Sequence, residues 1–311
     1  MDQRLKEALY IPYIKLHFEV ILIEDSILPS NKVSALRGGM GDMLLQSSCV
    51  GDGVCEECMF LSECMMQKTI YSQYERKPKF VTTGGSIGYV IECENYERQF
   101  LKGARLRFNL LLFGKTVAYF HMFFQAFFNL GKVGIGNMQG KYEIAEVTNS
   151  KKRIIYSDGK FDLSQYQVLH ILDYVVYRQK QLAHSILEHK LVFQTPVTLK
   201  YQRAYLQDFQ MEPILIAASR RIYMLDCYIG MDNLYYQQEE FHIPKIVCQS
   251  CIKMSVRRYS QRRQMSMYLK GIKGYCVVEE WYPEVLPLLL AGELIHIGKN
   301  TSFGFGRYRI K

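Results

Sequence analysis

Four of the nine cysteines lie within sixteen residues, at Cys49, Cys55, Cys58 and Cys64. The spacing is C-x5-C-x2-C-x5-C, and its central pair is typical of one half of a zinc knuckle, because two nearby thiolates can share a tetrahedral metal. Four soft ligands favour zinc first and an iron–sulfur cluster second. We therefore expect a structural zinc with all four positions closed, and no catalytic metal. Buried free thiols are the alternative.

A second group of chemically capable residues closes the chain, in HIGKNTSFGFGRYRI at 296–310. Its glycines and cations are Gly298, Gly304, Gly306, Lys299 and Arg307. Glycines would let backbone N–H groups approach a phosphate, and the cations supply positive charge. His296 is the candidate for proton transfer, because imidazole titrates near neutral pH. A packing or hydrogen-bonding role for His296 is the alternative.

The net charge of +9 favours a polyanionic partner. Four arginines lie in the seven residues 257–263, and we predict that Arg258 or Arg262 contacts this polyanion. Further candidate contacts to it are Arg37, Lys270 and Lys273. The alternative for these cations is a solvated face, or for Arg37 an intramolecular salt bridge.

The chain carries an internal repeat. Residues 131–144 read GKVGIGNMQGKYEI and residues 298–310 read GKNTSFGFGRYRI, so each segment begins with Gly-Lys and ends in Gly–basic–Tyr–charged–Ile. Strands are predicted at 14–23, 86–93, 106–112, 190–200, 252–258 and 274–280, and helices at 115–130, 204–228 and 283–291. Each half then has the order strand, helix, strand, strand, helix, strand.

We therefore predict an α+β fold with two tandem ferredoxin-like domains and a cysteine-rich metal-binding insertion. The N-terminal domain is expected at 1–150, with the cysteine knuckle at 49–64. The C-terminal domain with its glycine-rich loop is expected at 189–311. Residues 151–188 are predicted to be a linker or a helical connection between them.

Four stretches together resemble a known family. They are SALRGGMG at 34–41 followed by the cysteines, FQTPVTLK at 193–200, Arg258-Tyr259-Ser260 through Gly274, and the closing glycine loop. In this order they are similar to the CRISPR repeat-processing endoribonucleases (Cas-six) of the RAMP superfamily. The resemblance implies two ferredoxin-like domains with a cleft between them.

The resemblance also implies a task. Such an enzyme binds the repeat in precursor CRISPR RNA and cuts it once without a metal, by attack of the 2′-hydroxyl on the adjacent phosphate. Its partners would be that RNA and other CRISPR effector or adaptation proteins. Asp42 stands about where many members of the family carry a histidine, which favours an alternative: a non-catalytic RNA-binding RAMP subunit of an interference complex.

No run of 18 apolar residues is present, because His121 and Gln125 interrupt the richest stretch, 117–128. The first residues, MDQRLKEALYIPYIKL, do not place a cationic segment before an apolar one. We therefore expect a cytoplasmic protein without a membrane partner.

Overall fold

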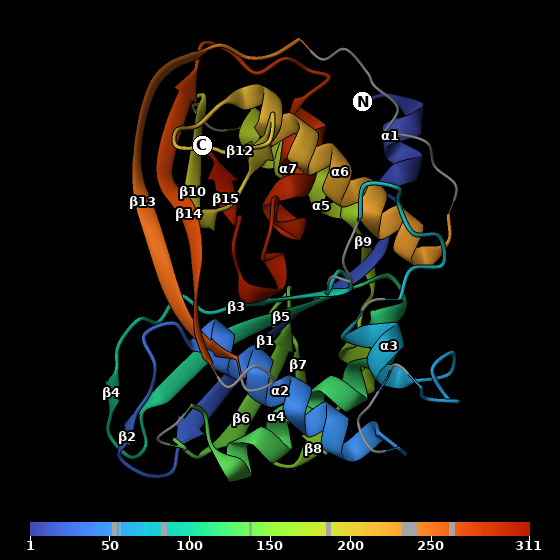
Figure 1. Ribbon diagram of the computed structural model, residues 1–311, viewed down its shortest axis with the longest axis vertical. Helices are drawn as coiled ribbons and strands as arrows, with labels where there is room; N and C mark the ends of the chain where they lie inside the picture. The colour runs from blue at the N-terminus through green and yellow to red at the C-terminus, as the bar shows by residue number, and fades with distance from the viewer. Residues whose placement is uncertain are drawn as a thin grey trace.

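The computed structural model describes residues 1–51, 55, 57–71, 73–81, 86–136, 139–184, 188–231, 242–260 and 265–311. Its strands form two main antiparallel sheets, one in each half of the chain, and helices pack on both (Figure 1). The fold is α+β, as predicted. In these ranges no helix is both long enough and apolar enough to cross a bilayer.

The first sheet has the strand order β3-β5-β1-β6-β7-β8, and a short strand, β9, also pairs with β1. Its strands are β1 (Pro12–Leu22), β3 (Tyr89–Glu92), β5 (Arg105–Phe113), β6 (Tyr142–Asn149), β7 (Ile154–Ser157), β8 (Lys160–Phe161) and β9 (Leu169–His170). The helices of this half are α1 (Gln3–Ala8), α2 (Lys32–Ser48), α3 (Met65–Thr69), η1 (Gly114–Tyr119) and α4 (Phe120–Val133). A small separate ladder pairs β2 (Ser26–Ile27) with β4 (Gln99–Phe100).

The second sheet has the order β13-β14-β10-β15. Its strands are β10 (Lys190–Val197), β13 (Ile246–Ser260), β14 (Met265–Val278) and β15 (Tyr308–Ile310), and β11 (Lys200–Tyr201) pairs separately with β12 (Ala204–Tyr205). The helices are η2 (Leu163–Gln165), α5 (Ile171–Ala183), α6 (Met211–Ile229), α7 (Leu286–Ile295) and η3 (Thr301–Phe303). The long hairpin β13–β14 reaches from this half to α2 of the other half (Figure 1).

Both halves contain the predicted order strand, helix, strand, strand, helix, strand. In each sheet the second, third, first and fourth of these strands are neighbours in that order. The two glycine segments occupy the same place, between the second helix and the fourth strand of each half. Several boundaries differ from the prediction. The helix predicted from residue 204 begins at Met211, because residues 200–205 form a hairpin, and the predicted strand 274–280 is the end of a longer strand.

Side-chain alternation explains how the halves pack. In β1, Ile14, Leu16 and Phe18 point to the core under α2 and α4, while Tyr13 points to the opposite face. Tyr13 belongs to a core shared with α6 and α7 of the second half. The first sheet therefore buries apolar side chains on both faces, and the two halves share one of their two cores.

One glycine of the first-helix motif, Gly39, lies where two helices come close together. A Cβ added to Gly39 on α2 would stand 2.4 Å from Leu130 Cδ1 on α4. A side chain here would require Leu130 to shift, so this glycine has a packing role.

The segment 151–188 contains β7, β8, β9 and α5. Its strands extend the first sheet, whereas α5 packs on α7 of the second half. On α5, the buried Arg178 donates from Nε to Glu293 Oε2 at 2.8 Å and from Nη2 to the carbonyl oxygen of Ile310 at 3.0 Å. Buried charges need such partners, so this ion pair fastens the connecting helix to the second half.

We expect Arg178→Ala to lower the free energy of unfolding by about 3 to 5 kcal/mol, because it leaves the Glu293 carboxylate buried beside fewer cations. Urea unfolding measures the change. Lys180→Ala on the same helix is the control, since Lys180 is exposed. Equal stabilities of the two variants would contradict the role of this ion pair.

Candidate nucleic-acid interface

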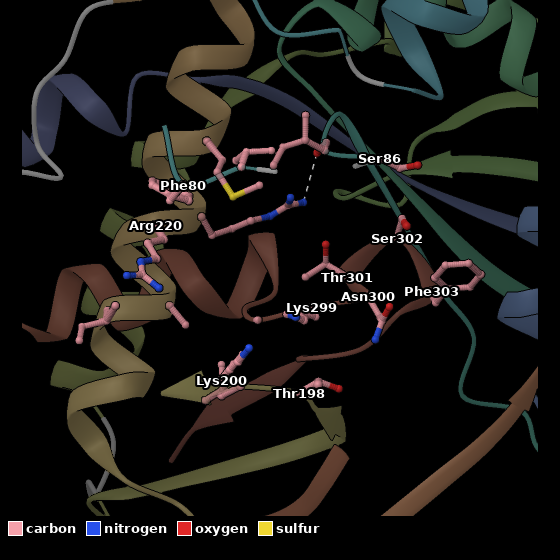
Figure 2. Close-up of a pocket in the computed structure, with 18 of the residues that line it drawn as sticks. Phe80, Ser86, Thr198, Lys200, Arg220, Lys299, Asn300, Thr301, Ser302 and Phe303 are labelled. Carbon is pink, nitrogen blue, oxygen red and sulfur yellow. Dashed lines mark hydrogen bonds between the residues drawn. The ribbon is translucent and has the colours of Figure 1, made fainter. Parts of the chain in front are cut away.

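A cleft of about 810 Å³ lies between the two halves. Figure 2 shows Phe80 and Arg220 on one side, the loop Lys299–Phe303 on the other, and Thr198 and Lys200 between them. The cations that line it are Arg37, Lys200, Arg220, Arg221 and Lys299. No aspartate or glutamate is among the described lining residues. The cleft therefore attracts polyanions.

Helix α6 supplies two of these cations with different surroundings. Arg220 is exposed, and its guanidinium carbon lies 5.4 Å from the centre of the Phe80 ring. Arg221 is buried and donates to the carbonyl oxygens of Ile295 and Ile87, both at 3.2 Å. Burial lowers the pKa of Arg221 to about 10, so it is still charged at neutral pH. Because Ile87 and Ile295 belong to different halves, Arg221 also fixes the floor of the cleft.

The cations of the other walls come from the second half and from α2. Lys200 lies on β11, and the exposed Lys299 places its Nζ 3.3 Å from the Tyr205 hydroxyl. Arg37 on α2 donates from Nε to Ser302 Oγ at 3.2 Å and from Nη2 to Ser86 Oγ at 2.9 Å. Among the described residues no carboxylate forms an ion pair with Arg37, so the salt bridge considered from the sequence is not formed there.

A second hollow, of about 570 Å³, lies where α2 and α4 meet the hairpin β13–β14. Arg98, Arg257 and Arg258 line it together with Asp42. Burial raises the pKa of the Asp42 carboxyl group. The hairpin side of this hollow is therefore basic, whereas its α2 side presents the Asp42 carboxyl group.

His296 differs from the sequence prediction. Its side chain is completely buried, its Nε2 lies 3.0 Å from Glu92 Oε1, and its Nδ1 lies 3.1 Å from the carbonyl oxygen of Phe305. Burial lowers the pKa of His296, and the Glu92 carboxylate opposes this effect. A catalyst must reach the RNA, so the geometry favours the alternative hydrogen-bonding role.

Glu92 is the centre of a buried polar cluster. Its Oε2 accepts hydrogen bonds from Lys15 Nζ at 2.7 Å and Asn109 Nδ2 at 2.8 Å, and its Oε1 lies 3.3 Å from Arg307 Nε. Lys15 comes first among the groups that hold the pKa of Glu92 well below its usual range, followed by His296 and Arg307, and they outweigh the effect of burial. Arg307 also pairs with Glu94. Arg307 is therefore occupied inside the protein, contrary to its predicted contact with RNA.

Two glycines of the closing loop also have internal roles. Gly304 and Gly306 are buried, and their N–H groups donate to the carbonyl oxygens of Thr301 and Pro196 at 2.8 Å each. Both have φ of +75°, and a Cβ at Gly306 would stand 1.9 Å from the Ile297 carbonyl oxygen. Because the fold uses both N–H groups, the geometry favours an internal role for them over the predicted approach to a phosphate. Gly298 and Lys299 do line the cleft.

The other predicted RNA contacts lie apart. Arg258 lines the second hollow. Lys270 and Lys273 lie on β14 and are not among the residues that line either hollow. Arg262 lies outside the described residues. The structure thus places Arg37, Gly298 and Lys299 in the first cleft and Arg258 in the second hollow, whereas the two lysines of β14 line neither.

The four clustered cysteines are not joined by disulfides. In the part of the chain that the structure describes, which includes all four, no three His, Cys, Asp or Glu side chains form a group that could hold a metal. The described positions therefore do not form the expected closed site, and the zinc stays a prediction.

Several cleft residues were missed from the sequence, namely Phe80, Ser86, Lys200, Arg220, Arg221 and Phe303. The pair Arg220-Arg221 interrupts a mostly apolar helix, which was an available signal for a functional face. The others lie in loops or at strand ends, and only the three-dimensional arrangement brings them together.

Two family models match the chain. Residues 11–169 match AF_1859_N, described as an N-terminal domain, and residues 191–308 match the model described as CRISPR-associated endoribonuclease Cas6. No curated protein shows a sequence match.

Solved structures share the fold at low sequence identity. A chain from "Partial Cas6-RT-Cas1--Cas2 complex" has a TM-score of 0.55 at 12% identity, over 97% of this chain and 46% of that one. A chain from "Cas6-RT-Cas1--Cas2 complex" gives the same TM-score and identity over 29% of its length. A Cas6 product complex matches with a TM-score of 0.48 at 13% identity, over 95% of this chain and 98% of that one. The chain thus spans less than half of each of the first two chains.

We expect Glu92→Gln to lower the free energy of unfolding at pH 7 by about 3 kcal/mol, because Lys15 and Arg307 lose their buried counter-charge. The pKa of Glu92 is lower in the folded state than the unfolded value near ~4.3, so its stabilisation is complete above that pH. The stabilisation is lost as the pH falls through the lower folded-state pKa. Urea unfolding at pH 7, 5 and 3 should show the gap to wild type narrowing.

The control for this experiment is Glu143→Gln, since Glu143 is an exposed carboxylate on β6. It should change stability by less than about 0.5 kcal/mol at each pH. A gap between wild type and Glu92→Gln that did not depend on pH would contradict the buried ion-pair network.

Proposed function

We propose that the chain is a Cas6-type CRISPR endoribonuclease, because its residues 191–308 match that family model, and that it binds the repeat in precursor CRISPR RNA and cleaves it without a metal. The observation that supports this proposal most directly is the cleft between the halves. Five cations line the cleft, and none of its described lining residues is an aspartate or glutamate. Such a surface neutralises the phosphates of a single RNA strand. The product is a mature guide RNA.

The proposed chemistry uses the RNA itself as nucleophile. The 2′-hydroxyl upstream of the scissile phosphate attacks the phosphorus, the 5′-oxygen leaves, and the ends are a 2′,3′-cyclic phosphate and a 5′-hydroxyl. Lys299 and Arg37 are placed to stabilise the crowded phosphate. Because His296 is buried, we propose that proton transfer uses tyrosine or lysine side chains of the cleft, such as Tyr201 and Lys200.

Two finer features belong to the same proposal. Each half would be a ferredoxin-like domain, which the shared strand order supports. The partners would include CRISPR adaptation proteins, since the first matching structures are titled as complexes of Cas6-RT-Cas1 with Cas2.

The second candidate function is a non-catalytic RNA-binding subunit of an interference complex. The burial of His296 and the presence of Asp42 in the second hollow favour it, because neither position offers an accessible imidazole. This candidate shares the cationic cleft and differs only in the fate of the bound RNA.

The test is incubation with the repeat RNA of the neighbouring CRISPR array in EDTA. We expect one cut per repeat, with a cyclic phosphate detected by mass spectrometry of the fragments. The matched control is the same RNA with a 2′-deoxy nucleotide before the cut, which should bind equally and stay intact. Bound but uncut RNA would support the non-catalytic subunit, and failure to bind would remove both functions.

We also propose that Cys49, Cys55, Cys58 and Cys64 bind a structural zinc, with an iron–sulfur cluster as the less favoured occupant. We expect about one zinc per chain when protein purified without chelator is analysed by plasma mass spectrometry. The control is a Cys55→Ser/Cys58→Ser variant, which should contain none. Wild-type protein without zinc or iron would refute the site.

A further inference from the structure

Two guanidinium groups pack against the Phe303 ring. The guanidinium carbon of Arg37 lies 4.2 Å from the ring centre and that of Arg258 lies 4.6 Å from it. Arg37 comes from α2 in the first half, whereas Arg258 comes from β13 in the second. Residues 221 positions apart in the sequence therefore meet over one aromatic side chain.

This meeting point lies between the two hollows. Arg37 and Phe303 line the 810 Å³ cleft, and Arg258 lines the 570 Å³ hollow beside α2. Figure 2 shows Phe303 at the edge of the first cleft, beyond Ser302. A strand that occupied both hollows would have to cross here.

The loop that carries Phe303 is held in place. The N–H of Phe303 donates to the carbonyl oxygen of Asn300 at 2.9 Å, and Ser302 Oγ accepts from Arg37 at 3.2 Å. Gly304 follows directly with φ of +75°, and a Cβ there would stand 2.9 Å from the Ile91 carbonyl oxygen on the other half. The ring position is thus fixed against both halves before any ligand binds.

Two guanidinium groups held by the same ring, at 4.2 and 4.6 Å from its centre, repel each other in the absence of an anion. A phosphodiester accepts hydrogen bonds from both, and the planar guanidinium matches two phosphate oxygens. The aromatic face attracts each cation and limits its freedom, which lowers the cost of ordering both on binding. The arrangement suits one phosphate better than two unrelated contacts.

We propose that Phe303 is a positioning residue that holds Arg37 and Arg258 as a paired site for one phosphate of the bound RNA, where the strand passes between the two hollows. The inference rests on the proposed function, because RNA is the ligand. It adds that the two arginines act on the same phosphate and that the ring keeps them together.

The test is binding of the repeat RNA, by fluorescence anisotropy, to Arg37→Ala, Arg258→Ala and the double variant. Each single change should weaken binding about tenfold, as expected for loss of a charge-assisted hydrogen bond. The double variant should lose only about ten- to twentyfold, well short of the hundredfold of independent contacts. Arg153→Ala removes an exposed charge from the β6–β7 turn and should change binding less than twofold.

The ring itself is tested by Phe303→Leu and Phe303→Tyr. The leucine variant should bind about five- to tenfold more weakly with unchanged net charge, and the tyrosine variant should stay within twofold of wild type. Thermal melting reports whether each Phe303 variant is folded. If Phe303→Leu is not folded, the binding data of the single and double arginine variants alone test the inference. Wild-type affinity in Phe303→Leu, or multiplicative arginine effects, overturns the inference. Wild-type protein that does not bind the repeat refutes the proposed function, and the inference falls with it.

Discussion

The buried carboxylate of Glu92 is the constraint on which the arrangement of the two halves depends. It lies on β3 of the first half, yet it pairs with His296 and Arg307 of the second half as well as with Lys15. A carboxylate that is almost completely buried is costly unless every lone pair has a donor. Those donors are available only when the halves adopt one relative position. The same position sets the width of the cationic cleft.

The two sides of the closing loop, residues 296–310, have different roles, and this difference follows from the pairing with Glu92. Its inward side, with His296, Gly304 and Gly306, is used for hydrogen bonds and close backbone contacts within the protein. Its outward side presents Lys299 and Phe303 to the cleft. The histidine and two of the glycines therefore have an indirect role, which is to hold in place the side chains that face the cleft.

Much of the fold could be predicted because strand alternation and helix caps are local signals. The repeated element order and the place of both glycine segments emerged from periodicity and spacing alone. The burial of His296 could not be predicted from the sequence, because its partner Glu92 is 204 positions away. No local pattern distinguishes a buried imidazole from an exposed one. The run 257–263 was correctly recognised as basic, but which arginine meets Phe303 depends on where the long hairpin ends against α2.

A glycine-rich loop beside cations is easily interpreted as a backbone cradle for phosphate, and here that interpretation fails for a physical reason. A cradle needs N–H groups without internal partners. Gly304 and Gly306 have such partners, and their positive φ values serve tight turns against the other half and against Ile297. The cations that line this cleft are side chains from α2, β11, α6 and the closing loop. Because these elements belong to both halves, the arrangement of the cleft's cations depends on the interface that Glu92 maintains.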